Sequence, residues 1–168
     1  MNETADVYSI DSRNNHMKSI FLMFVLLLPG SLHAGESDHA LDGDVITVKS
    51  PEEILSKQKL KQFVGISSDT AGATGLSMNL VIIPPGGAAE AHYHDGFESA
   101  VYLVQGRVET RFGKDLEKSV INESGDFIFI PPNVPHQPRN LSETEPAIAI
   151  VSRNDANEQE NVVHYQPE

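Results

Sequence analysis

The sequence predicts an all-β fold, built as a small sandwich or barrel of antiparallel strands. Short runs of β-branched and aromatic residues recur along the chain, and Gly-rich or Pro-rich segments such as Pro84-Pro85-Gly86-Gly87 separate them. Within residues 107–112, charged and apolar side chains alternate, which predicts a strand with one wet face and one buried face. The predicted strands are residues 63–66, 76–83, 88–94, 98–104, 107–112, 119–121, 126–130 and 148–152.

One short helix is expected ahead of the first strand. Ser50-Pro51-Glu52-Glu53 has the form of a capping box with proline at the first helical position. The helix should run to about Lys61, with Ile54, Leu55 and Leu60 as its apolar contacts.

Length and composition limit the classes of function. The chain has 168 residues, the size of a single domain. It has no cysteine, which excludes disulfides, a thiolate zinc site and a cysteine nucleophile. A net charge of −12 argues against nucleic-acid binding, because phosphates require clustered Lys and Arg. Solubility explains this acidity better than a specific basic partner does.

The start of the chain has the pattern of a secretory signal peptide. Met17-Lys18-Ser19 is followed by an apolar run, residues 20–28, and then by Pro29-Gly30-Ser31-Leu32-His33-Ala34. The run is shorter than the roughly 20 apolar residues that span a bilayer. We therefore expect residues 1–34 to be a signal peptide, with Met17 as an alternative start and cleavage near Ala34. The protein would be exported, periplasmic or secreted, and its mature form would not be embedded in a membrane.

The rest of the chain is expected to have three parts. Residues 35–75 form an N-terminal extension with the short helix and strands, residues 76–153 form the barrel, and residues 154–168 form a C-terminal tail that begins as a solvated surface segment. Residues 45–48 can extend the sheet edge of a neighbouring copy. Because such β-addition covers an exposed edge strand, we expect a homodimer.

The stretch HYHDGFE, residues 92–98, is the strongest candidate for a functional site. His92 and His94 lie two residues apart in a predicted strand, so their side chains point to the same face. Asp95-Gly96 is a turn signal that would bring Glu98 opposite them. Two imidazoles and one carboxylate form the facial arrangement typical of non-haem iron and related divalent metals. The alternative is three unrelated polar residues at a strand end.

A second segment, residues 125–140, places another histidine after an apolar strand and a proline-rigid bend. With this segment, the chain resembles the cupin superfamily. The first cupin motif, G(X)5HXH(X)3,4E(X)6G, corresponds to Gly86, His92, His94, Glu98 and Gly106. The second, G(X)5PXG(X)2H(X)3N, corresponds to Gly125, Pro131, Asn133, His136 and Asn140.

Two positions depart from these motifs. Seven residues rather than six separate Glu98 from Gly106, and Asn133 stands where the motif has glycine. Asparagine adopts the left-handed backbone more readily than most residues, so the bend should form. Ser99 holds the alternative position to Glu98 but is a poor metal ligand, so Glu98 is the expected ligand.

The resemblance covers residues 76–152 and implies a double-stranded β-helix, a jelly-roll-like barrel of two antiparallel sheets with a metal inside. The implied metal is one divalent transition ion, and Mn, Fe, Ni, Co and Zn all suit such a site. The ligands that the resemblance implies are His92, His94, Glu98 and His136.

These ligands predict a metal-dependent enzyme of the oxygenase, decarboxylase or isomerase type, acting on a small oxygen-rich substrate that chelates the metal. The alternative is a metal-containing cupin that binds a small ligand without turnover, and a barrel without metal would leave the ligand set unexplained. A further titratable group in the pocket would favour the enzyme. Tyr102 lies four residues after Glu98, so its side chain is expected on the same face of the strand, and it is the candidate catalytic residue. A buried tyrosine more often packs in the core with its hydroxyl at the rim. Glu90 lies near the mouth by sequence, and a solvated charge explains it equally well.

Overall fold

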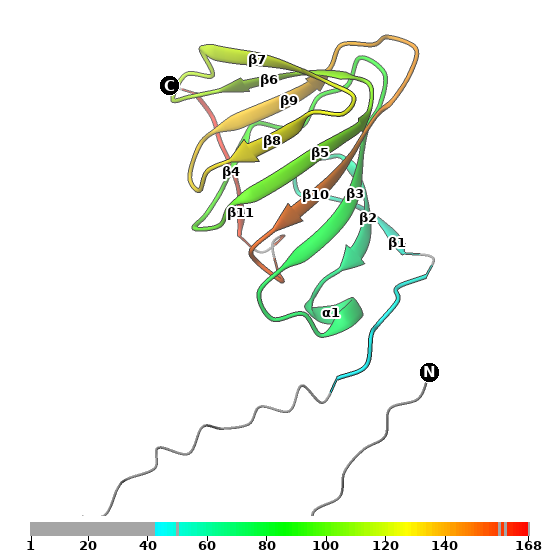
Figure 1. Ribbon diagram of the computed structural model, residues 1–168. Helices are drawn as coiled ribbons and strands as arrows, with labels where there is room; N and C mark the ends of the chain where they lie inside the picture. Colours follow the sequence, from blue (N-terminus) through cyan, green and yellow to red (C-terminus); the bar gives the residue numbers. More distant parts are fainter. Residues whose placement is uncertain (1–42, 50, 158, 160, 168) are drawn as a thin grey trace, which may run out of the picture. The chain divides into compact units, whose positions relative to one another are not determined.

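The computed structural model describes residues 43–49, 51–157, 159 and 161–167, and it confirms the all-β fold (Figure 1). These residues form two antiparallel sheets. In spatial order, the six-stranded sheet consists of β1 (Glu52–Leu55), β2 (Lys61–Ile66), β3 (Ser77–Ile83), β10 (Ala147–Arg153), β5 (Ser99–Gln105) and β8 (Phe127–Ile130). The five-stranded sheet consists of β11 (Val162–His164), β4 (His92–His94), β9 (His136–Asn140), β6 (Arg107–Phe112) and β7 (Lys118–Glu123).

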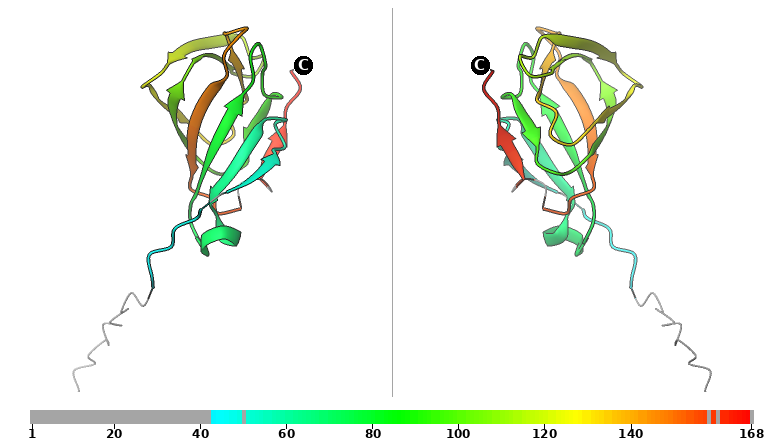
Figure 2. Two further views of the ribbon diagram at one scale, coloured as in Figure 1. Left: turned by 90° about the vertical axis from the view of Figure 1, so that its right-hand side faces the viewer. Right: turned by 90° about the vertical axis from the view of Figure 1, so that its left-hand side faces the viewer.

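The two sheets face each other, and the hydrophobic core lies between them (Figure 2). Along β3 and β10 every second residue is buried, as a strand with one inward face requires. Val81 and Val151 represent this inward row, and Leu103 of β5 and Val108 of β6 belong to the same cluster. Burying each such side chain contributes about 1.5–3 kcal/mol. The same inward rows bound the space in which the candidate site lies.

The prediction of a helix over residues 51–61 is wrong. Glu52–Leu55 is strand β1, which pairs antiparallel with β2. The turn between them is closed by Ser56, whose backbone N–H donates to the carbonyl of Leu60 at 2.9 Å and whose hydroxyl accepts from the N–H of Leu60 at 3.2 Å. The capping box that predicted a helix would contribute about 1 kcal/mol to its stability. The hairpin buries Leu60 in the core and adds two strands to the sheet, so tertiary packing overrides the local signal.

The one short helix of the described chain, α1 (Ser68–Ala71), follows β2 instead of preceding it. Its cap is reciprocal: the hydroxyl of Ser67 accepts from the N–H of Thr70 at 3.2 Å, and the hydroxyl of Thr70 accepts from the N–H of Ser67 at 2.9 Å. Gly72 ends the helix with a left-handed φ of 65°.

The eight predicted strands correspond to β2–β8 and β10, whereas the sequence did not predict β1, β9 and β11. Strand β9 contains Pro138, a residue that argues against an interior strand. Strand β11 pairs with β4 and buries Val162, and Ala156 ahead of it is also buried. The described part of the tail is therefore built into the fold, because β11 extends the five-stranded sheet beside β4.

The predicted signal peptide, residues 1–34, lies outside the described residues and stays a prediction. In the part of the chain that the structure describes, no helix has the length and apolar character needed to cross a membrane.

Candidate metal centre

Three histidines from two neighbouring strands converge between the sheets. His92 and His94 come from β4, and His136 is the first residue of β9, paired directly opposite His92. Each offers one ring nitrogen, and these three atoms lie within 4.8 Å of one another. The three side chains are 2–4% exposed. The sheet thus brings together residues that are more than forty positions apart, as the two motifs imply.

Hydrogen bonds to the backbone orient two of the rings. The Nδ1 of His92 donates to the carbonyl of Glu90 at 2.7 Å, and the Nδ1 of His136 donates to the carbonyl of Val134 at 2.9 Å. A carbonyl can only accept, so in each neutral ring the proton is on Nδ1 and the lone pair is on Nε2. Such outer hydrogen bonds fix the tautomer of metal-binding histidines.

The third ring is held by a side chain. The Nδ1 of His94 lies 2.8 Å from the hydroxyl of Ser99, and the ring stacks on Phe97 with centroids 4.7 Å apart. Its Nε2 is buried and makes no hydrogen bond to any described residue. A buried polar atom without a partner costs about 1–3 kcal/mol. A divalent cation that accepts the lone pair of this nitrogen would give it a partner, so the three residues fit a metal.

The three imidazoles are neutral at ordinary pH. Burial is the main cause that lowers the pKa of each ring from 6.5: to about 3 for His92, about 2 for His94 and about 4 for His136. The positive charge of Arg153 lowers all three further. Metal ligation requires unprotonated rings, so the site is already in its ligating form.

Glu98, the fourth expected ligand, does not join this group. Its side chain is exposed, and its backbone N–H donates to the Oδ1 of Asn154 at 2.8 Å. Ser99 points inward instead and is 1% exposed. Counting four residues after His94 places Ser99 at the motif position and leaves the required six before Gly106. The strand register therefore assigns the family's carboxylate position to a serine.

Tyr102 is also outside the site. Its side chain points outward, like that of Glu98, and is 39% exposed. It packs on Phe127 with ring centroids 4.8 Å apart. Glu90 lies at the surface, where its carboxylate is 3.0 Å from the Nδ1 of His164. Neither residue lines the cavity beside the histidines. Tyr102, the catalytic candidate from the sequence, therefore lies outside the cavity.

A cavity of about 90 Å³ lies beside the three histidines. Its polar lining includes Ser56, Gln58, Gln62 and Thr110, each at most 7% exposed. The apolar lining residues are Leu60, Val81, Ile83, Ala89, Val101, Leu103, Val108, Ile128, Ile130, Pro138, Ala147, Ala149 and Val151. Mostly apolar walls with a few convergent polar groups are typical of small-molecule sites.

The sequence interpretation missed Arg153, which lines the same cavity and is 6% exposed. The signal was present in the alternation of β10, where Ala147, Ala149 and Val151 point inward and Arg153 continues their row. A charged residue on an inward row is unusual, because burying a charge is costly without compensation.

Comparison with known proteins agrees with this geometry. Residues 79–152 match the family model described as a cupin domain. A polyketide synthase, CurC, of Streptomyces cyaneus is 36% identical over 77 residues, which are 45% of this chain and 47% of that protein. The match thus spans about half the length of that relative.

Solved structures share the fold at low sequence identity. The polyketide cyclase RemF from Streptomyces resistomycificus superposes with a TM-score of 0.61 at 17% identity, covering 74% of this chain and 88% of that one. The oxalate decarboxylase of Lactobacillus farciminis, in a formate complex, gives a TM-score of 0.60 at 22% identity, covering 81% and 41%. Residues 79–152 are therefore a cupin domain, and the fold and the motif residues agree with that match.

Proposed function

We propose that His92, His94 and His136 hold one divalent transition metal and that the protein is a metal-dependent enzyme. Its substrate would be a small oxygen-rich molecule that chelates the metal. The observation that supports this most strongly is the convergence of three neutral, buried imidazoles with the unpartnered Nε2 of His94. When bound, such an ion acts as a Lewis acid that polarises substrate oxygens.

The chain itself supplies orientation and a dry environment. The carbonyls of Glu90 and Val134 and the hydroxyl of Ser99 hold the imidazoles in place. The apolar walls exclude bulk water, which strengthens electrostatic interactions inside the cavity. Oxygenation, decarboxylation and isomerisation are all compatible with this arrangement. Two proteins of similar fold, a cyclase and a decarboxylase, are enzymes, which supports the same role here.

The second candidate is a metal-containing cupin that binds a small ligand without turnover. It is favoured by one observation: among the described residues that line the cavity, no carboxylate, lysine or tyrosine accompanies the three histidines. An enzyme that relies on general acid–base catalysis normally has such a group within reach of the substrate. Turnover of a chelating substrate by the metal-loaded protein would distinguish the two candidates.

Metal content and its pH dependence test the site directly. The purified protein is expected to contain or accept about one divalent ion per chain, and to keep it at about pH 5.5, where an ordinary histidine is mostly protonated. Protons compete with the metal for the imidazoles, and pKa values of about 4, 3 and 2 delay that competition. Occupancy should therefore fall only as the pH approaches about 4.

The measurement is elemental analysis after dialysis at each pH, with circular dichroism to confirm that the protein is folded. Protein that carries no metal and accepts none would contradict the proposed function. A loss of metal centred near pH 6.5 would show that the histidines titrate as if exposed.

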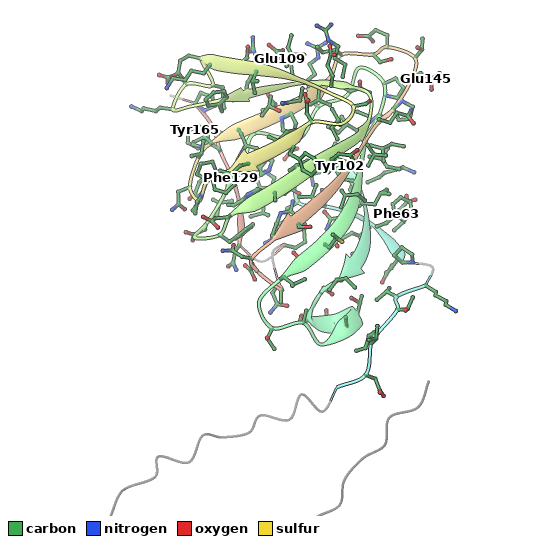
Figure 3. All side chains as sticks on the ribbon, in the orientation of Figure 1. Phe63, Tyr102, Glu109, Phe129, Glu145 and Tyr165 are labelled. Atoms are coloured by element: carbon green, nitrogen blue, oxygen red, sulfur yellow. The ribbon has the colours of Figure 1, made fainter. Side chains whose placement is uncertain are left out.

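We also propose a homodimer, and apolar exposure supports it. Val45 and Ile46, in the segment expected to reach a neighbouring sheet, are 96% and 55% exposed. Phe127 and Phe129 of β8 are 85% and 61% exposed, and Tyr102 lies beside them on the outer face of the six-stranded sheet (Figure 3). Large apolar side chains gathered on one face are typical of interaction surfaces.

Light scattering across a wide range of protein concentrations is expected to give a dimer mass. Phe127→Glu should shift the mass toward the monomer, because it places a charge in the apolar face of both copies. Ile121→Glu, on the outer face of β7 in the other sheet, is the matched control and should leave the mass unchanged. A monomer mass for the unmodified protein at every concentration would refute the proposal.

A further inference from the structure

A second cavity lies apart from the three histidines, where helix α1 meets the first strands of the six-stranded sheet. We call it the outer cavity. Its volume is about 290 Å³. One side chain, Gln62, lines both the outer cavity and the cavity beside the histidines. The residues that line the outer cavity are Glu52, Ile54, Gln62, Val64, Ser67, Ser68, Asp69, Thr70, Ser77, Asn79, Ala156, Asn157 and Gln159.

Hydrogen bonds join the segments that form its walls. Ser77 and Asn79 lie on the buried row of β3 and form one wall. Helix α1 lies at the end of β2 and forms another (Figure 1). The N–H of Ser68 in this helix donates to the carbonyl of Ala156 at 3.3 Å, and its hydroxyl donates to the Oδ1 of Asn157. The outer cavity is therefore built from strands, helix and C-terminal segment together.

Two polar groups of this lining have no hydrogen-bond partner among the described residues. One is the hydroxyl of Ser77, a residue that is 0% exposed and whose Oγ is buried. A buried hydroxyl without a partner is destabilising, so a ligand that bonds to it would relieve that cost. The other is the Nδ2 of Asn157, the donor end of an amide whose Oδ1 already accepts from Ser68.

The lining favours a neutral ligand with several hydroxyl groups. It contains no Lys, Arg or His among the described residues, so nothing there compensates an anion. Its two carboxylates, Glu52 and Asp69, belong to exposed residues and give a cation no buried counter-charge. The Ser, Thr, Asn and Gln side chains of the lining both donate and accept, as the hydroxyl groups of a sugar do. Ile54 and Val64 supply an apolar surface for the C–H groups of a sugar ring.

We propose that the outer cavity binds one neutral monosaccharide and that the hydroxyl of Ser77 hydrogen-bonds to it. A cavity of roughly 150 Å³ holds a benzene molecule. A volume of about 290 Å³ therefore accommodates a six-membered sugar ring with its hydroxyl groups, whereas the cavity of about 90 Å³ beside the histidines does not. Because none of the three histidines lines the outer cavity, the proposal does not rest on the metal-dependent function.

Nuclear magnetic resonance of the isotope-labelled protein, titrated with D-glucose, D-galactose and D-mannose, would test the site. At least one of these hexoses is expected to shift the amide signals of Ser77, Asn79 and Ala156, and to saturate in the millimolar range. The signals of β4 and β9, which carry the histidines, should not move. No shift with any hexose at concentrations far above that range, or shifts confined to β4 and β9, would overturn the proposal.

Ser77→Ala should weaken binding of that hexose roughly 3- to 10-fold, which corresponds to one net hydrogen bond. Its melting temperature should not fall, because the substitution removes an unpaired buried hydroxyl. Ser119→Ala, at an exposed serine of β7, is the matched control and should change neither quantity. If Ser77→Ala does not fold, Asn157→Ala, at an exposed position, is expected to weaken binding in the same way. Unchanged affinity in the folded variant contradicts the proposed site.

Two further titrations test the ligand class and the independence from metal. The uronic acid of the same hexose keeps the ring and adds a carboxylate, and it should bind at least about 10-fold more weakly. Equal binding of the two would show that the cavity does not select a neutral ligand. Binding of the hexose should persist after treatment with a chelator, and its loss would overturn the outer cavity as the site. A protein that accepts no metal but binds the hexose would contradict the proposed function alone.

Discussion

Replacing His136 with alanine is expected to remove most of the bound metal while leaving the β-rich fold in place. The side chain supplies one of three converging ring nitrogens, so its loss leaves His92 and His94 as a weak pair. Changes to residues that merely orient metal ligands cost about 10–100-fold in affinity, and the loss of a ligand should cost at least as much. The six-stranded sheet does not include β9, so most of the core strands are independent of this side chain.

Elemental analysis after dialysis, together with circular dichroism, would measure both parts of this expectation. His164→Ala is the matched control: that histidine lies on β11, is about half exposed and contacts Glu90 at the surface. It should keep its metal. Full metal content in the His136 variant would show that the ion binds elsewhere and that the three-histidine site does not exist as described.

Asn140→Ala is expected to lower the free energy of unfolding by about 2–4 kcal/mol. Asn140 is fully buried, and its Nδ2 donates to the carbonyls of Ile83, Pro84 and Glu145 at 2.8–3.2 Å. Its Oδ1 accepts from the N–H of Ser142 at 3.0 Å. Alanine would leave several buried backbone groups without partners, each at a cost of about 1–3 kcal/mol, reduced where water enters.

Urea unfolding in the presence of a chelator would measure this loss without a contribution from metal binding. Asn161→Ala is the control, because that residue is exposed and its amide bonds only to the carboxylate of Asp155 among the described residues. It should cost less than about 1 kcal/mol. If Asn140→Ala were as stable as the control, the second-motif asparagine would have no structural role in holding the loop after β3.

The sequence by itself determined much of this protein. Eight strands were predicted from the alternation of apolar and polar residues and from the turn residues between these runs. A strand with one buried face can be recognised in this way because its pattern is local. The shared face of His92 and His94 follows from the same period of two. The left-handed Asn133, with φ of 62°, also follows from local chemistry.

Tertiary structure alone decided the composition of the site. The first motif allows three or four residues between His94 and its acidic position, so by spacing from His94 alone that position is either Glu98 or Ser99. The pairing of β5 with β10 and β8 chooses between them, since a shift of one residue exchanges the inward and outward faces of a strand. The same register sends Tyr102 outward and leaves the site with histidines as its only described ligands.

The remaining differences have one physical cause. The segment after Ser50 has a valid helix start, yet it forms a strand because pairing with β2 buries Leu60 in the core. Arg153 and His136 meet in one cavity although β10 and β9 belong to different sheets. Local patterns report what each segment can become and which side chains share its face. Which faces meet depends on long-range strand pairing, whose energy comes from contacts between residues far apart in the chain.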